Sequence, residues 1–288
     1  MRLLFAASLI SVSFTSTALA DDGKLFLSGS TTLIPIVSNA AEAFTQQYQT
    51  WDQFDATLPS QAIVIETSGG GSGQGVRAVL DKVADAGMVA RDLRPQEVEA
   101  MGDHQVVRVG IDAVAIAARH DNPLHSIHDN LDTDTLKSIF SGEVSRYNQI
   151  DNNLADQEVV LLVRDSSAGS AVMLQRQILG ETPVSDRALQ MSSQGQLLRT
   201  LLGNPFTFAY ISAGLVNANE ELKAFALNGV APTQSNVVSG DYTLARPLLI
   251  VYQDADNAYL DAFMRYLLSD DGQKVVTDLG YIPVKADQ

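Results

Sequence analysis

Short apolar runs alternate with helix-like segments along most of the chain, and this alternation restricts the fold more than any other feature. The runs are rich in Val, Ile and Leu, as the buried strands of an α/β sheet are. They lie at residues 24–29, 62–68, 106–119, 159–165, 206–212 and 247–253. Between them, apolar side chains recur at the spacing of amphipathic helices. This strand-then-helix order predicts an α/β fold.

Three helix-like segments carry clear apolar stripes. In the first, Pro35 falls in the opening turn, where its missing N–H costs nothing. The third helix is expected to run towards Gly272. The stripes are Val37, Ala41, Phe44 and Tyr48, then Val76, Val79, Leu80 and Val83, then Tyr259, Phe263, Tyr266 and Leu267.

The run at residues 106–119 is long for a single strand. We interpret it as a strand that leaves one lobe and enters another, with the crossover near residues 110–112. If the chain crosses back near residues 246–247, both ends of the sequence build the first lobe. The predicted division is lobe I at 21–111 plus 246–288 and lobe II at 112–245.

The first twenty residues, "MRLLFAASLISVSFTSTALA", have the pattern of a secretory signal peptide. Arg2 gives a minimal positive start, the apolar stretch is too short to span a membrane, and residues 18–20 fit a small-x-small cleavage site. An uncleaved anchor is the alternative. The chain has no cysteine, which excludes disulfides and thiolate catalysis and removes the usual point of lipid attachment after an export signal. Without an anchor, an exported protein would be lost from a cell that has no outer membrane, so we expect this protein in the Gram-negative periplasm.

The formal net charge of −15 argues against nucleic acid or an anionic membrane as a partner. Binding to either depends on many contacts from Lys and Arg. A single small anion is not excluded, because the exposed N–H groups at a helix N-terminus bind an anion locally whatever the global charge.

Three segments share one design, in which a strand ends and a cluster of Gly, Ser and Thr opens a helix. They are "SGSTT" (28–32), "SGGGSGQG" (68–75) and "RDSSAGS" (164–170). In an α/β sheet, ligands bind outside the carboxyl ends of the strands, where helix N-termini point. Three such segments with Arg164 would suit one tetrahedral oxyanion. Ordinary helix capping is the alternative, although the density of glycine exceeds what capping needs.

The sequence departs from other nucleotide-binding motifs and from a hydrolase motif at single positions. Val76 stands where a P-loop needs Lys, and Gln74 replaces a required glycine of both the dinucleotide fingerprint and a hydrolase elbow around Ser72. The histidines in "RHDNPLHSIHDN" (119–130) match no standard zinc spacing, so we expect a solvated loop. Tyr147 is expected to pack beneath a loop.

The order and spacing of several segments together resemble a known family, over essentially the whole mature chain. The segments are "SGSTTLIPI", "SGGGSGQGVRAVLDKVADAGMVARDL", "GIDAVAIAAR", "LKSIFSGEVSRYNQI", "RDSSAGS", "FAYIS", "NGVAPTQSNVVSGDYTLARPLLIVY" and "GQKVVTDLGYIPV". The family is that of the phosphate-binding proteins of bacterial ABC transporters, the PstS family of periplasmic solute-binding proteins.

The resemblance implies a two-lobed periplasmic-binding-protein fold of type II, with the ligand cleft between two α/β lobes joined by a two-strand hinge. It also implies a monomer that binds inorganic phosphate, serves an inner-membrane ABC permease, and has neither catalysis nor a cofactor. The positions that match the family's ligand contacts are Ser30, Thr31 and Thr32 in the first segment, Ser72 in the second, and Arg164, Gly169 and Ser170 in the third.

Two positions depart from the family pattern. Ala168 stands where the family has a ligand-binding Ser, and Ala90 stands where it has an Asp or Ser that reaches the ligand. An acceptor at the second position lets a site demand a protonated anion, so its loss predicts weaker or less selective phosphate binding. Ser166, Ser167 and Arg91 are candidates to compensate.

Two other functions are consistent with these residues. One is a related oxyanion-binding protein with altered selectivity or with a sensing or adhesion role, which the two alanines would allow. The other is a secreted serine hydrolase with Ser72 or Ser170 as nucleophile, against which the failed motif argues.

Overall fold

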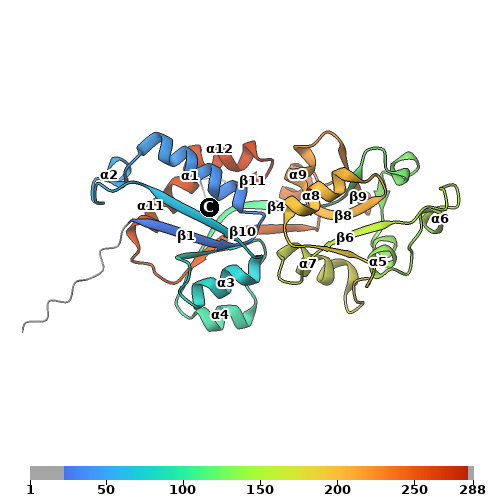
Figure 1. The fold of residues 1–288 in the computed structure, drawn as a ribbon, viewed down its shortest axis with the longest axis horizontal. Coiled ribbons are helices and arrows are strands. Elements are labelled where there is room, and N and C mark those ends of the chain that lie inside the picture. The colour runs from blue at the N-terminus through green and yellow to red at the C-terminus, as the bar shows by residue number, and fades with distance from the viewer. Residues whose placement is uncertain (1–22, 285–288) are drawn as a thin grey trace, which may run out of the picture.

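The computed structural model describes residues 23–284. The molecule is elongated and has two halves, each a sheet covered by helices (Figure 1). The first half is built from both ends of the chain, and the second half is built from its middle. The predicted signal peptide at residues 1–20 lies outside the described residues.

Three parallel strands form the first half of the sheet, and a fourth strand joins them in the opposite direction. Strand β1 lies between β2 and β3, while β10 runs antiparallel to β3. The strands are β1 (Lys24–Gly29), β2 (Val64–Gly69), β3 (Ala86–Val89) and β10 (Ala245–Tyr252). The helices are α1 (Ile34–Tyr48), α2 (Trp51–Phe54), α3 (Ser72–Leu80), α4 (Pro95–Met101), α11 (Ala258–Leu268) and α12 (Asp270–Asp278).

Alternate side chains of these strands enter two different cores, because successive residues of a strand face opposite sides of the sheet. Met88 packs in the core beneath α1, α11 and α12, and its neighbour Val89 packs in the core beneath α3 and α4. Ile250 and Val251 divide in the same way. The first half is therefore a three-layer α/β/α structure.

The long strand predicted at residues 106–119 is a single strand, β4 (Gln105–Arg119), which runs from one half into the other (Figure 1). Its first part pairs with β10 and with β11 (Ile282–Pro283), and its second part pairs with β8 and β9. The buried residue Val109 belongs to the core of the first half, and Ala113 belongs to the core of the second.

The second half has a mixed sheet in which β6, β7 and β8 are parallel to one another. Its strands are β5 (Asn130–Leu131), β6 (Val160–Arg164), β7 (Leu189–Met191), β8 (Thr207–Ser212) and β9 (Leu222–Leu227). Its helices are η1 (Pro123–Ser126), α5 (Thr133–Ser141), α6 (Tyr147–Ile150), α7 (Gly169–Leu174), η2 (Gln175–Leu179), α8 (Gln194–Gly203), α9 (Ala213–Asn217) and α10 (Gln234–Ser239). The α/β prediction is confirmed.

Several local expectations were wrong. Helix α3 ends at Leu80, so Val83 lies beyond the helix and is exposed rather than part of its stripe. The last long helix stops at Leu268, and a new helix capped by Ser269 contains Gly272. Beyond these two corrections, the structure adds the short helix α2, in which Trp51 is fully buried and its Nε1 donates to the carbonyl of Gly23 at 2.8 Å.

The histidine loop is also more ordered than predicted. His125 is almost fully buried and stacks on Phe225, with the ring centroids 3.9 Å apart. Tyr147 is buried as expected, and its hydroxyl accepts a hydrogen bond from Asn122 Nδ2 at 2.6 Å. Among residues 23–284, no helix is long and apolar enough to cross a membrane.

Candidate functional site

The carboxyl ends of β1, β2 and β6 carry the three predicted polar segments, and the structure brings these segments together at the seam between the two halves. Strands β1 and β2 end side by side, with Gly29 opposite Gly69. Strand β6 ends at Arg164 in the other half, and Arg164 reaches across to the first segment. This is the edge of an α/β sheet where ligands bind.

The hydroxyl of Thr31 is the point where donors from the second half converge. Arg164 Nη1 donates to Thr31 Oγ1 at 3.3 Å, and the backbone N–H of Gln194 donates to the same oxygen at 3.2 Å. Both donors therefore aim at one acceptor on the first half, as they would at an oxygen of a bound oxyanion.

The guanidinium group of Arg164 is buried, with only 2% of its side chain exposed, and is held mainly by neutral groups. Nε donates to Met191 O at 3.0 Å, and Nη2 donates to Ser192 O at 3.2 Å. Its one carboxylate contact is Asp165 Oδ2 at 3.2 Å, and that side chain is 28% exposed. Burial lowers the pKa of Arg164, Asp165 opposes this, and repulsion from Arg246 adds to it. The surroundings of Arg164 therefore destabilise its charged form more than its one carboxylate partner stabilises it.

The glycine-rich loop packs directly on the third segment from the opposite half. Ser167 Oγ donates to Gly70 O at 3.0 Å, and the N–H of Gly73 donates to Ser167 O at 3.3 Å. Gly71 has a φ of 88°, and a Cβ there would lie 2.5 Å from Ser167 Oγ. Only glycine permits this approach.

Ser72, Ala90 and Gly169 form a tight contact across the seam. Ser72 is fully buried at the start of α3, and its Oγ accepts a hydrogen bond from the N–H of Ala90 at 3.0 Å. A Cβ on Gly169 would lie 2.2 Å from Ala90 O and 3.0 Å from Ser72 Oγ. The next residue, Ser170, is fully buried, and its Oγ has no hydrogen-bond partner among residues 23–284.

Ser30 and Thr32 lie beside Thr31, but their hydroxyls are engaged within the first half and at the crossover. Ser30 Oγ accepts from the N–H of Thr32 at 3.3 Å. Thr32 Oγ1 accepts from Arg246 Nη2 at 3.1 Å. Of the three hydroxyls predicted in this segment, that of Thr31 is the one that makes hydrogen bonds to the opposite half among residues 23–284.

A buried ion pair marks the crossover between the halves, and the sequence reasoning did not find it. Arg246 donates to Asp112 Oδ2 from Nε at 3.0 Å and from Nη2 at 2.7 Å, while Ser212 Oγ donates to Asp112 Oδ1 at 2.6 Å. Asp112 and Arg246 stand opposite each other on β4 and β10. Their side chains are only 1% and 2% exposed.

The sequence reasoning also missed Gln194, the first residue of α8. The segment "SSQGQ" (192–196) repeats the design of the other three, since it follows a strand and opens a helix. The preceding strand β7 has only three residues, and Leu189 and Gln190 on it are exposed. The sequence therefore contains no apolar run from which this strand could be predicted.

The two positions that depart from the family pattern place only alanine at the seam. Ala90 is fully buried against Gly169, and Ala168 is also buried. Arg91 does not replace them, because its guanidinium makes a bidentate pair with Glu97 at 2.7 Å for each bond.

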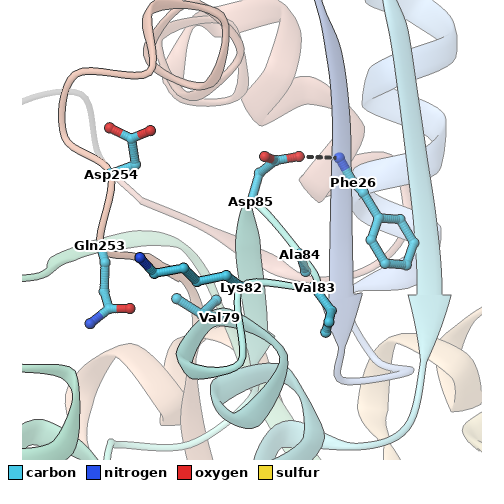
Figure 2. A pocket seen from close by; sticks show the side chains of 8 residues that line it. All are labelled: Phe26, Val79, Lys82, Val83, Ala84, Asp85, Gln253 and Asp254. Atoms are coloured by element: carbon cyan, nitrogen blue, oxygen red, sulfur yellow. Dashed lines mark hydrogen bonds between the residues drawn. The ribbon is translucent and has the colours of Figure 1, made fainter. Parts of the chain in front are cut away.

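The cavities distinguish the two edges of the first sheet. One of 530 Å³ is lined almost entirely by the second half, including Arg164, Ser166 and Tyr210, and one of 210 Å³ lies at the seam, lined in part by Gly169 and Arg246. A third, of 460 Å³, lies by the amino end of β3, where Asp85 accepts a hydrogen bond from the backbone of Phe26 (Figure 2). No predicted site residue lines this third cavity.

The histidines do not contribute to the site. Each has a hydrogen-bond partner elsewhere, and none of these partners is Ser72 or Ser170. Among residues 23–284, no group of His, Cys, Asp and Glu could hold a metal ion.

Comparison with known proteins gives one family and a consistent set of relatives. Residues 15–271 match the model of the PBP superfamily domain. Phosphate-binding protein PstS of Bacillus subtilis is 28% identical over 91% of this chain and 81% of its own length. A Clostridium perfringens protein, described as a phosphate ABC transporter substrate-binding protein and solved with bound phosphate, has a TM-score of 0.78 at 24% identity, over 91% of this chain and all of its own. An ABC-type phosphate transport receptor from Vibrio cholerae has a TM-score of 0.69 at 24% identity, over 90% and 100% of the two chains.

Proposed function

The chain belongs to the PBP superfamily, and we propose that it is an extracytoplasmic solute-binding protein that captures inorganic phosphate for an ABC importer. The observation that carries the proposal is the buried guanidinium of Arg164, which has only a partly exposed carboxylate as counter-charge and points across the seam at Thr31. A buried cation in this state favours an anionic ligand. The names of the relatives, a phosphate-binding protein among them, point to the same ligand.

We assign phosphate contacts to Ser30, Thr31, Thr32, Ser72, Arg164, Gly169 and Ser170. Thr31 and Ser72 come from the first half, and Arg164, Gly169 and Ser170 come from the second. A ligand held by both sets stabilises the closed arrangement of the halves over an open one, which is hinge closure. In this proposal lobe I comprises residues 21–111 and 246–288, lobe II comprises residues 112–245, and β4 and β10 form the hinge.

The protein in this proposal is a periplasmic monomer that delivers its ligand to an inner-membrane permease without making or breaking a bond. The curated relatives are binding proteins. Support against a hydrolase comes from Ser72, whose Oγ accepts a hydrogen bond from backbone rather than facing a histidine.

Calorimetric titration of the mature protein with phosphate tests the proposal. Arg164→Met should weaken phosphate binding by at least about tenfold, since a hydrogen bond to a charged group contributes about 1.5–3 kcal/mol. Ligand-induced compaction in small-angle scattering should be lost as well. Arg199→Met, which removes an exposed arginine of the same half, is the matched control and should bind as the unchanged protein does. Equal phosphate affinity in the Arg164 variant would contradict the site assignment.

A further inference from the structure

Gln194 combines near-complete burial with an unpartnered polar side chain. Only 2% of the residue is exposed, and neither Oε1 nor Nε2 has a hydrogen-bond partner among residues 23–284. Burying a carboxamide in this state is costly, because the group loses its bonds to water and gains none in return. Such a group is retained where something else satisfies it.

The position of Gln194 places its amide beside the predicted anion contacts. Its backbone N–H lies 3.2 Å from Thr31 Oγ1, and that oxygen lies 3.3 Å from Arg164 Nη1. Gln194 is the first residue of a ten-residue helix, and the cap residue Ser193 already satisfies the N–H of Gln196. The side chain of Gln194 is therefore not needed for capping, and it is attached to a residue whose backbone already contacts Thr31.

The carboxylates near this point are already engaged. Asp165 accepts from Arg164 Nη2 and from the N–H of Ser167. Asp112 accepts from Arg246 and Ser212. A carboxylate that faced the ligand would repel an oxyanion oxygen lacking a proton. Two neutral groups on the segments of the second half, the amide of Gln194 and the hydroxyl of Ser170, are buried without a partner among residues 23–284.

We propose that the carboxamide of Gln194 contacts the bound oxyanion and sets the specificity of the site. The inference rests on the proposed function. Nε2 donates to an ionised oxygen, and rotation of the amide lets Oε1 accept from a protonated one. A site in which this amide contacts the ligand does not require a proton on the ligand. It therefore takes tetrahedral dianions of the sulfate class as well as hydrogen phosphate.

Replacing the amide by a carboxylate of the same shape tests the proposal. The unchanged protein and Gln194→Glu are titrated by calorimetry with phosphate and with sulfate at neutral pH. The unchanged protein should bind both anions. In the variant, sulfate affinity should fall at least about tenfold more than phosphate affinity, because only phosphate has a proton to give to the carboxylate. Gln234→Glu is the matched control, since Gln234 is also the first residue of its helix but is exposed.

Gln194→Ala gives a second readout that needs no buried charge. Loss of a neutral hydrogen bond should weaken both anions by roughly 2- to 13-fold. Rejection of sulfate by the unchanged protein, or an unaltered sulfate-to-phosphate ratio in Gln194→Glu together with unaltered binding in Gln194→Ala, would overturn the inference while phosphate binding stands. A folded protein that binds neither anion would instead remove the proposed function, and this inference with it.

Discussion

Two buried arginines lie where the halves meet, and they differ in what neutralises them. Arg246, at the crossover of β4 and β10, makes two bonds to a carboxylate that is almost fully buried. Arg164, at the carboxyl end of β6, is held by backbone carbonyls and by one partly exposed carboxylate. Each arginine has one carboxylate partner, but the partner of Arg246 is almost fully buried and accepts two bonds, whereas the partner of Arg164 is partly exposed and accepts one longer bond.

This difference separates a structural pair from a binding group. A buried pair is costly to break, because removal of one partner leaves an uncompensated charge in a low-dielectric interior. A buried cation whose charge is only partly stabilised by its protein partners favours an anionic ligand, because the ligand supplies the remaining stabilisation when it binds. We therefore expect changes at Asp112 to act on stability, and changes at Arg164 to act on binding.

The largest expected effect comes from breaking the structural pair. Asp112→Asn keeps the shape of the side chain but leaves Arg246 without a negative partner, and the free energy of unfolding should fall by about 3–5 kcal/mol. Urea unfolding at neutral pH without phosphate measures it. A loss below about 1 kcal/mol would mean that the two arginines do not differ as described.

A second prediction concerns a buried group that can give up its charge. Burial, and then the nearby Lys223, lower the pKa of His125 from 6.5 to about 4, although Asp129 acts in the opposite direction. Since the folded pKa is the lower one, the contribution to stability is complete above about pH 6.5 and is lost as the pH falls towards 4. By pH 5 the loss should be on the order of 1 to 2 kcal/mol, because solvent screens part of the effect.

His125→Phe isolates this contribution, because an aromatic ring can still stack on Phe225. Unfolding free energies of the two proteins are compared between pH 7.5 and pH 5. The variant should lose less stability than the unchanged protein over this range, and parallel pH profiles would contradict the assignment.

The smallest effect is expected at an exposed pair. Arg119 Nη2 and Asp121 Oδ2 are 2.8 Å apart, but 44% of the Asp121 side chain is exposed. Asp121→Asn should change the free energy of unfolding by less than about 1 kcal/mol, because solvent screens exposed ion pairs. Measured in the same urea series, it serves as the control for Asp112→Asn, and an equal loss in both would remove burial as the explanation.

The sequence predicted the main strands because each is a short apolar run between turn residues. It predicted the passage of β4 between the halves because fourteen apolar-rich residues are too many for one ordinary strand. It missed β7, which is short and largely exposed, and it carried the α3 stripe to Val83 although the helix ends at Leu80. The spacing of apolar residues along the chain does not show where a helix ends or which short segment pairs with a sheet.

By itself, the sequence determined the α/β class, the three polar segments and Arg164, because each of these is a local pattern of residues. Only the tertiary structure decided which groups meet. It gave Arg246 a buried carboxylate, left Arg164 with a weaker one, and placed the amide of Gln194 beside Thr31. The reason is physical: Asp112 and Arg246 are 134 positions apart and Thr31 and Gln194 are 163 positions apart, so no local pattern shows these contacts. Asp165 directly follows Arg164, but the burial of the arginine and the partial exposure of the carboxylate depend on the rest of the fold.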